Sequence, residues 1–176
     1  MQESALDNKN QTGLIGWDII NEQWFSAHEG DLDGIVYATK VDGNNLYVGG
    51  NFSVSSPATS QIIAQNLYSV QLNNKVAQRI PATCYSTQEC ADQIIYSIAL
   101  FPSKILYEHP NASSIYIAGR FTTIDDIIVN NVARLYDERW ISLDTGITSS
   151  NIELVFSLAL SPGTFSISIF FVFPAF

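Results

Sequence analysis

The chain has 176 residues, of which 47% are hydrophobic and 14% are charged, a composition typical of a folded globular protein. Its 17 acidic residues outnumber its 8 basic residues, which gives a formal net charge of -9, and the basic residues form no cluster. Because a negative field repels phosphate groups, this balance disfavours nucleic acids and anionic lipid surfaces as partners.

Residues 1–12 form a polar N-terminal segment without the charged head and apolar run of a secretory signal peptide. Residues 13–34 then predict two short strands, at 14–18 and around Trp24, that are followed by a glycine. A matching strand pair occurs later in the chain around Trp140. We therefore expect the chain to open with the end of one repeating unit.

Residues 35–93 predict a complete unit of four antiparallel strands. The expected strands are 35–41, 46–50, 62–72 and 75–80. The first two are joined by Asp-Gly-Asn-Asn, whose residues tolerate the positive φ of tight hairpin turns. Gly49 and Gly50 carry no Cβ, which permits close backbone approach or a bulge in the second strand.

Residues 94–153 repeat this order as a second complete unit, and residues 154–176 begin a third. The expected strands of the second unit are 94–101, 114–118, 131–136 and 140–143. The apolar segment at the C-terminus is much shorter than the roughly 20 residues that a membrane-spanning helix needs. We read it as a strand, because it is rich in β-branched and aromatic residues.

The repetition is visible in the sequence itself. Residues 46–52 read LYVGGNF and residues 115–121 read IYIAGRF, and the first strands of successive units start at 36, 95 and 155. The repeat-motif residues that we expect to be structural are Tyr47, Gly49, Gly50, Phe52, Tyr116, Gly119 and Phe121, with Trp24 and Trp140 on the later strand. A period near 60 indicates stacked units, and no window has a helical apolar period, so the chain is predicted to be all-β.

These motifs resemble the blades of kelch-like β-propellers, in particular those of fungal cortical-marker (bud-site and polarity) surface proteins and of related amoebal and bacterial repeat proteins. The resemblance implies a partial β-propeller of about two complete four-stranded antiparallel blades plus parts of the flanking blades. It also implies surface exposure and partner binding, not chemistry. The chain departs from the pattern at Ala118, which replaces the first motif glycine, and at Lys75, which stands in place of a tryptophan.

Cys84 and Cys90 enclose a short polar segment, and they form either a loop disulfide or two free thiols. We favour the disulfide, which would indicate an oxidising compartment. Asn10 and Asn111 stand in Asn-X-Ser/Thr sequons and are candidate glycosylation sites. A third sequon, at Asn51, lies inside the strand motif, where a glycan would fit badly.

The sequence offers no residue set for catalysis, cofactor binding or metal binding. His28 and His109 are isolated, and no nucleophile elbow or phosphate-binding loop is present. The acidic pairs Asp31/Asp33 and Asp125/Asp126 are interpreted as solvated loop residues instead of calcium ligands, because the spacing of a calcium-binding loop is missing. We therefore expect no cofactor.

The sequence-based hypothesis is a non-catalytic interaction or structural module, a fragment of the ectodomain of a surface or secreted protein that is membrane-tethered at full length. Loops 53–60, 84–90 and 122–130 are expected to bind a protein or glycan ligand, and open sheet edges allow self-association. One alternative is that the chain is part of a carbohydrate oxidase-like propeller enzyme whose catalytic residues lie outside it. Another is a fragment without independent function.

Overall fold

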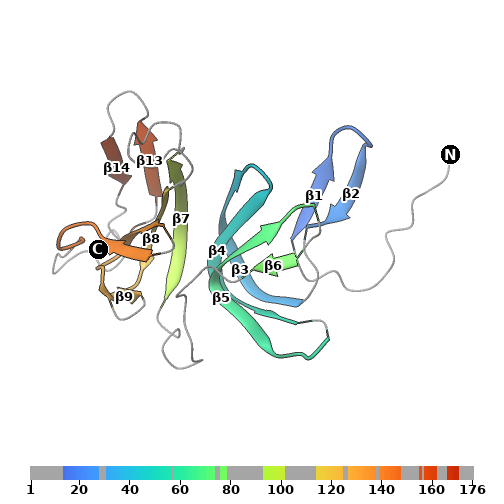
Figure 1. The fold of residues 1–176 in the computed structure, drawn as a ribbon, viewed down its shortest axis with the longest axis horizontal. Coiled ribbons are helices and arrows are strands. Elements are labelled where there is room, and N and C mark those ends of the chain that lie inside the picture. Colours follow the sequence, from blue (N-terminus) through green and yellow to red (C-terminus); the bar gives the residue numbers. More distant parts are fainter. Residues whose placement is uncertain are drawn as a thin grey trace, which may run out of the picture.

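The computed structural model contains only β secondary structure in the residues it describes (Figure 1), which confirms the predicted all-β class. The described residues are 14–27, 31–56, 58–73, 76–78, 93–101, 114–124, 127–137, 139–147, 155, 157–161 and 166–170. The strands are β1 (Ile15–Asp18), β2 (Gln23–Ser26), β3 (Asp31–Asp42), β4 (Asn45–Ser55), β5 (Ile62–Gln71), β6 (Val76–Gln78), β7 (Ile94–Phe101), β8 (Ser114–Arg120), β9 (Thr123–Ile124), β10 (Ile127–Ile128), β11 (Val132–Tyr136), β12 (Arg139–Ser142), β13 (Ser157–Ser161) and β14 (Ser166–Phe170).

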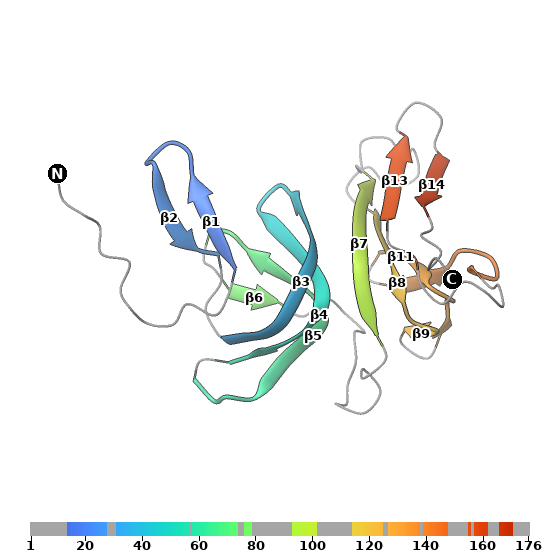
Figure 2. The same cartoon turned by 180° about the vertical axis from the view of Figure 1, so that it is seen from behind.

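Two four-stranded antiparallel sheets form the body of the molecule. The first sheet has the order β3-β4-β5-β6, and the second sheet has the order β7-β8-β11-β12. A hairpin of β1 and β2 precedes the first sheet, and a hairpin of β13 and β14 follows the second, as Figure 2 shows from behind. The strands of each sheet follow one another in the order that the sequence predicted.

Two strand boundaries differ from the prediction by more than two residues. Strand β3 begins at Asp31 instead of residue 35, and β4 continues to Ser55 instead of ending at Gly50. The cause is a ladder that runs past the glycine motif and pairs Asp31 with Ser55 and Leu32 with Val54. Residues 53–55, which were expected in a loop, therefore belong to a strand.

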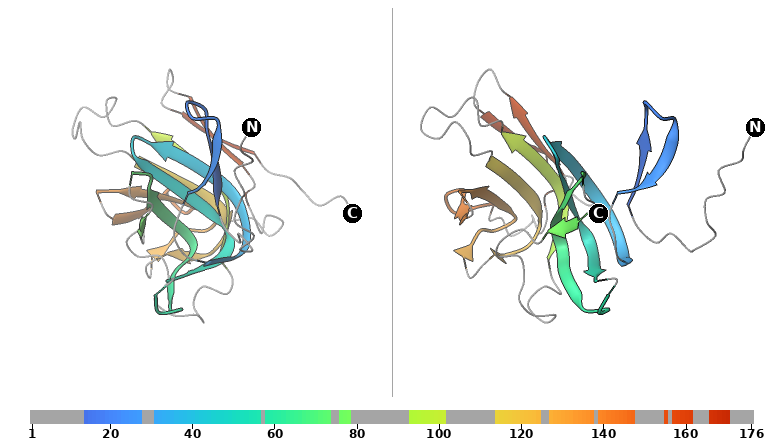
Figure 3. Two further views of the ribbon diagram at one scale, coloured as in Figure 1. Left: turned by 90° about the vertical axis from the view of Figure 1, so that its right-hand side faces the viewer. Right: turned by 45° about the vertical axis from the view of Figure 1, so that its right-hand side comes forward.

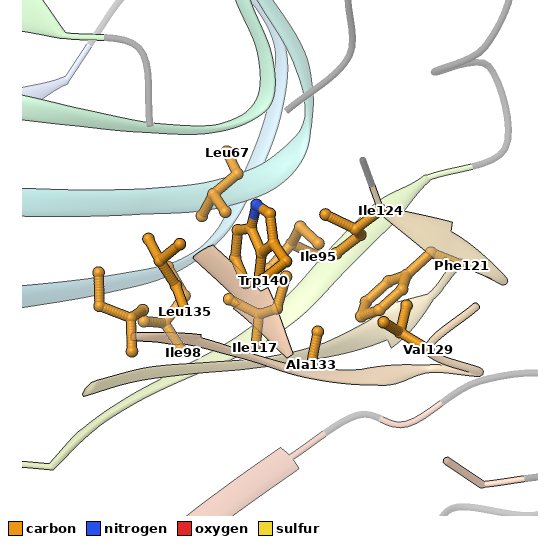
Figure 4. Close-up of a cluster of buried hydrophobic side chains, with 11 residues drawn as sticks. Leu67, Ile95, Ile98, Ile117, Phe121, Ile124, Val129, Ala133, Leu135 and Trp140 are labelled. Carbon is orange, nitrogen blue, oxygen red and sulfur yellow. The ribbon is translucent and has the colours of Figure 1, made fainter. Parts of the chain in front are cut away.

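The sheets and hairpins stack face to face in chain order, with a hydrophobic core in each interface (Figure 3). The N-terminal core, between the β1–β2 hairpin and the first sheet, contains Ala27, Leu32, Leu46, Val48, Phe52, Val54, Ala64, Tyr68 and Val70, with Leu14 and Phe25 packed against it. The central core, between the two sheets, contains Leu67, Ile95, Ile98, Ile115, Ile117, Phe121, Ile124, Val129, Ala133, Leu135 and Trp140 (Figure 4). The C-terminal core, between the second sheet and β13, contains Ala99, Ala118, Val132, Val155 and Leu158. Each sheet thus buries its two faces against different neighbours.

Candidate interaction surface

The first strands of the two sheets, β3 and β7, carry the same irregularity at the same place. The register of β3 on β4 shifts between Val36 and Ala38, and the register of β7 on β8 shifts between Ile95 and Ser97. The residue skipped in each ladder is a tyrosine, Tyr37 in one and Tyr96 in the other. Their ring centroids lie 5.0 Å apart, so this bulge brings equivalent aromatic side chains of neighbouring sheets into contact.

A buried asparagine lies in the third strand region of both units, Asn66 inside β5 and Asn131 directly before β11. Asn66 has a φ of 60° and Asn131 a φ of 70°, a left-handed conformation that asparagine tolerates better than most residues. The side-chain oxygen of Asn66 accepts a hydrogen bond from the backbone N–H of Phe52 at 3.0 Å. The side-chain oxygen of Asn131 accepts the equivalent bond from Phe121 at 3.1 Å. The bond of Asn131 fastens the two ends of the connection between β8 and β11, whereas the bond of Asn66 links β4 to β5 inside the ladder.

The second glycine of each motif is required by a backbone contact. A Cβ on Gly50 would lie 2.1 Å from the carbonyl oxygen of Ile35, and one on Gly119 would lie 1.8 Å from that of Ile94. Such separations are far below van der Waals contact, and a backbone oxygen in a paired strand cannot move aside. The motif glycines therefore keep the second strand close to the first.

The first motif position faces the next sheet. A Cβ on Gly49 would lie 2.7 Å from Cγ2 of Ile95. At the equivalent position of the second sheet, Ala118 is fully buried in a core that contains Val155, which replaces Ile95 in the repeat. Valine keeps the Cγ2 atom of isoleucine, so the smaller size of Val155 does not by itself explain why alanine is accepted here.

Tyr47 and Tyr116 occupy equivalent environments. Both are partly buried, Tyr47 against the central core and Tyr116 against the C-terminal core, so each faces the sheet that follows its own. Burial, and to a smaller extent the charge of Asp42, raises the pKa of Tyr47 above its usual value. The recurring tyrosines therefore pack between sheets.

The two tryptophans of the repeat motif have different surroundings although their strand pairing is the same. Trp24 pairs with Trp17 between β1 and β2, and Trp140 pairs with Leu135 between β11 and β12, in matching registers. Trp140 is buried in the central core beside Leu67 (Figure 4), whereas Trp24 is exposed and its ring lies edge-on to that of Trp17. The sequence predicted that they are equivalent but gave no sign of this difference in burial.

Two connections between the second and third strands lie at one end of the sheets (Figure 1). Residues 56–61 form a turn in which the N–H of Ser60 donates to the carbonyl oxygen of Ser56 at 2.9 Å. In the second unit the connection contains the short pair β9–β10, with an exposed Ile128, and is closed by bonds from the N–H groups of Val129 and Asn130 to Thr122. The second connection starts and ends at the Phe121–Asn131 bond, and the first closes the β4–β5 ladder beyond the Phe52–Asn66 bond. Both connections are candidates for partner binding.

Several predicted site residues lie outside the described part of the chain. They are Asn10, His28, Lys75, Cys84, Cys90, His109, Asn111, Asp125 and Asp126, so the disulfide, the glycosylation sites and the loop 84–90 stay predictions. Asn51 lies in β4 with an exposed side chain, and Asp31 and Asp33 lie exposed in β3 instead of in a loop. In the ranges that the structure describes, no three His, Cys, Asp or Glu residues gather as a metal site would require. No helix that could cross a membrane occurs there either.

Comparison of the chain with protein-family models, with curated proteins and with solved structures gave no match. The similarity that bears on function is internal, because the two sheets share a bulge, a buried asparagine and a motif glycine at equivalent positions. A scaffold of repeated units with clamped connections at one end is suited to holding a surface in a fixed shape.

Proposed function

We propose that the chain is a non-catalytic interaction module built from kelch-like propeller blades, part of a secreted or surface-exposed protein. The observation that supports this most directly is the equivalence of Asn66 and Asn131, which accept the same hydrogen bond from the motif phenylalanines Phe52 and Phe121 in two successive sheets. Stacked units of this kind bury their apolar faces only against one another, and their loops are free for recognition. The propeller arrangement rests on this repetition and on the motif resemblance.

The binding surface of this proposal is the end of the molecule that carries residues 56–61 and 122–130. The first connection offers small polar residues, among them exposed Thr59 and Ser60, and the second offers an exposed isoleucine, Ile128. Small polar side chains and one apolar contact on a rigid base suit a protein or glycan ligand better than a charged one.

The extracellular location is part of the proposal. It is supported by the two cysteines flanking one short polar segment, Cys84 and Cys90, and by the sequons at Asn10 and Asn111. An oxidised pair and glycan attachment are both properties of exported proteins. Mass spectrometry under non-reducing conditions, on the chain purified from a eukaryotic secretion host, detects both the disulfide and the attached glycans.

The proposal is tested by binding of the full chain to arrays of cell-surface glycans and of purified ectodomain proteins. We expect a ligand whose binding is lost in the double variant Thr59→Gly/Ile128→Ser. The matched control is Asn44→Ser, because Asn44 is also exposed but lies in the β3–β4 turn, at the other end of β4. The proposal would be contradicted if the double variant bound the ligand as well as the unchanged chain does. Copper-dependent oxidation of a sugar by the chain would contradict it as well.

A further inference from the structure

The two hairpins at the ends of the described chain match the two halves of a complete sheet. The β1–β2 ladder pairs Trp17 with Trp24 as β11–β12 pairs Leu135 with Trp140. The β13–β14 ladder pairs Leu158 with Ile169, as β7–β8 pairs Ile98 with Ile117. The chain thus carries the last two strands of one unit before its first sheet and the first two strands of another after its second sheet.

Each hairpin is only a half-sheet in the part of the chain that the structure describes. β1 and β2 form a two-stranded sheet, and so do β13 and β14. In the second sheet the corresponding strands, β8 and β11, pair directly through residues such as Arg134 and Tyr116. The edges that would make this central pairing, those of β1 and β14, have no such partner strand in the described ranges.

The β1–β2 hairpin also has an uncovered apolar face. Of the eleven large hydrophobic residues that are exposed in the described chain, five lie between Ile15 and Trp24. Ile15, Trp17 and Trp24 are 48%, 46% and 56% exposed, and we call them the tryptophan face. Their register counterparts in the second sheet are Ala133, Leu135 and Trp140, which are only 0%, 8% and 3% exposed. What covers the counterparts is the first sheet, with Leu67 against the Trp140 ring (Figure 4).

We propose that a second copy of this chain covers the tryptophan face, head to tail. Strand β1 of one copy pairs with β14 of the other and completes a four-stranded sheet in the order β2-β1-β14-β13, which matches β12-β11-β8-β7. The register of β8 on β11 places Trp17 of one copy opposite Ile167 of the other. In this sheet the tryptophan face lies against the second sheet of the copy that supplies β14, as Trp140 lies against the first sheet within one chain.

The surface that receives the tryptophan face has a suitable chemistry. Arg134 lies half-buried on the second sheet, where its Nε and Nη2 donate hydrogen bonds to the hydroxyl of Ser114 at 3.1 and 2.9 Å. Its guanidinium carbon lies 4.5 Å from the ring centroid of Tyr136 and 5.7 Å from that of Tyr116. Ile141 pairs with Arg134 across β11 and β12 and is 40% exposed, so it shares this face. An aromatic and aliphatic surface with one arginine attracts indole rings through apolar contact and cation–π interaction.

The number of copies follows if the sheets are propeller blades, a step that rests on the proposed function. In the described ranges each copy contributes two complete sheets and half of each shared sheet, so a closed pair of these 176-residue chains contains six such sheets. Closed propellers have about four to eight blades. Two copies would give six blades, which lies within this range, and three copies would give about nine, which exceeds it. The proposal is therefore a closed dimer with two identical head-to-tail interfaces.

Light scattering coupled to size exclusion, on the full 176-residue chain, gives the first test. We expect the mass of a dimer for the unchanged chain and of a monomer for Trp24→Glu, because the interface would bury an unpaired carboxylate and weaken association by more than about tenfold. The matched control is Ile62→Glu, which places the same charge on an isoleucine that is 47% exposed at the far end of β5 and should stay dimeric. Far-ultraviolet circular dichroism checks that each variant keeps its β structure.

The head-to-tail arrangement has its own test. Ile141→Glu alters the receiving surface and should also be monomeric, but an equimolar mixture with Trp24→Glu keeps one intact interface and should form dimers again. Benzoylphenylalanine in place of Trp24 should crosslink to a peptide containing Ile141 of the other copy, identified by mixing light and heavy isotope-labelled chains. A monomeric unchanged chain, an open polymer, or a dimer indifferent to Ile141→Glu would overturn the proposal. Ligand binding by monomeric Trp24→Glu is a separate readout, so failure of the dimer and failure of the proposed function can be told apart.

Discussion

The side-chain oxygen of Asn131 lies 3.1 Å from the backbone nitrogen of Phe121 and accepts its hydrogen bond inside the molecule. Both residues are buried, so water cannot replace the acceptor. Asn131 does this with a φ of 70°, which costs most other residues about 1–2 kcal/mol. The same side chain therefore satisfies a buried donor and tolerates the bend that leads into β11.

Replacing Asn131 with alanine is expected to lower the free energy of unfolding by about 2–4 kcal/mol, because it leaves a buried N–H unsatisfied and strains the backbone. Asn131→Asp keeps an acceptor and should cost less, and Asn131→Gly keeps the conformational tolerance and isolates the loss of the hydrogen bond. Urea denaturation followed by circular dichroism measures all three. An alanine variant within about 0.5 kcal/mol of the unchanged chain would contradict this role. Asn66→Ala should behave like Asn131→Ala.

The pair Gly49 and Ile95 predicts a coupled effect on stability. Gly49→Ala alone should cost about 1–3 kcal/mol, because the new methyl group meets Cγ2 of Ile95 at 2.7 Å. Ile95→Ala alone should cost about 2–5 kcal/mol, because it removes both Cγ atoms and Cδ1 from the core. The double variant Gly49→Ala/Ile95→Ala lacks the Cγ2 atom that the new methyl group would meet, so it should be more stable than the sum of the single effects by at least about 0.5 kcal/mol. Additive effects in a double-mutant cycle of urea denaturation would show that the two side chains do not share space.

The order of strands was predictable because the repeat gives two independent copies of each strand. Strand β7 lies where the sequence placed it, and the bounds of β8, β11 and β12 differ by only one or two residues from the prediction. The extension of β4 to Ser55 was not predictable, because a serine-rich stretch is typical of a loop and only the ladder with β3 makes it a strand.

The apolar C-terminal segment was read from the sequence as a strand, and strand β14 lies in it. Strand β14 reads SISIF and pairs with β13 in the register by which β8, beginning SIYIA, pairs with β7. Its correspondence to β8 was hard to read from the sequence, because phenylalanine stands where the glycine motif is expected and the connection to β13 is short.

Burial of the motif tryptophans could not be read from the repeat either. Sequence equates Trp24 with Trp140, but exposure depends on whether a neighbouring sheet covers the strand, which is a property of the stack. The role of the two asparagines was also missed. Their signal was an asparagine directly before an apolar run in both units, at 66 and at 131, but asparagine is common in turns and its buried acceptor role needs the fold to be seen.

The contrast between Trp140 and Trp24 predicts different costs for the same substitution. Trp140→Ala should destabilise the chain by about 3–5 kcal/mol, because it opens a cavity in the central core. Trp24→Ala should cost only about 0.5–1.5 kcal/mol, since the indole mainly contacts the ring of Trp17. Urea denaturation at a dilution that keeps the chain monomeric separates these effects from self-association. Equal losses for the two variants would contradict the burial described for them.

The turn between β1 and β2 predicts a pH effect centred on Asp18. Its carboxylate accepts hydrogen bonds from the side-chain amide of Asn21 at 2.7 Å and from the backbone N–H groups of Ile20 and Asn21 at 2.9 and 3.1 Å. The bond from the Asn21 side chain, followed by the two backbone bonds, holds the pKa of Asp18 below its usual value.

Because the folded pKa is lower than the unfolded one of about 3.9, the turn gains stability from Asp18 at pH values above the unfolded pKa and loses it as the pH falls through the folded pKa. Titration of the Asp18 carboxyl carbon by nuclear magnetic resonance should give a midpoint below that of aspartate in an unfolded peptide. Asn21→Ala removes the strongest donor and should move the midpoint back toward the peptide value, while Asp18→Asn should abolish the pH dependence of the amide shifts of Ile20 and Asn21. A midpoint unaffected by Asn21→Ala would mean that the turn does not hold the carboxylate in its ionised form.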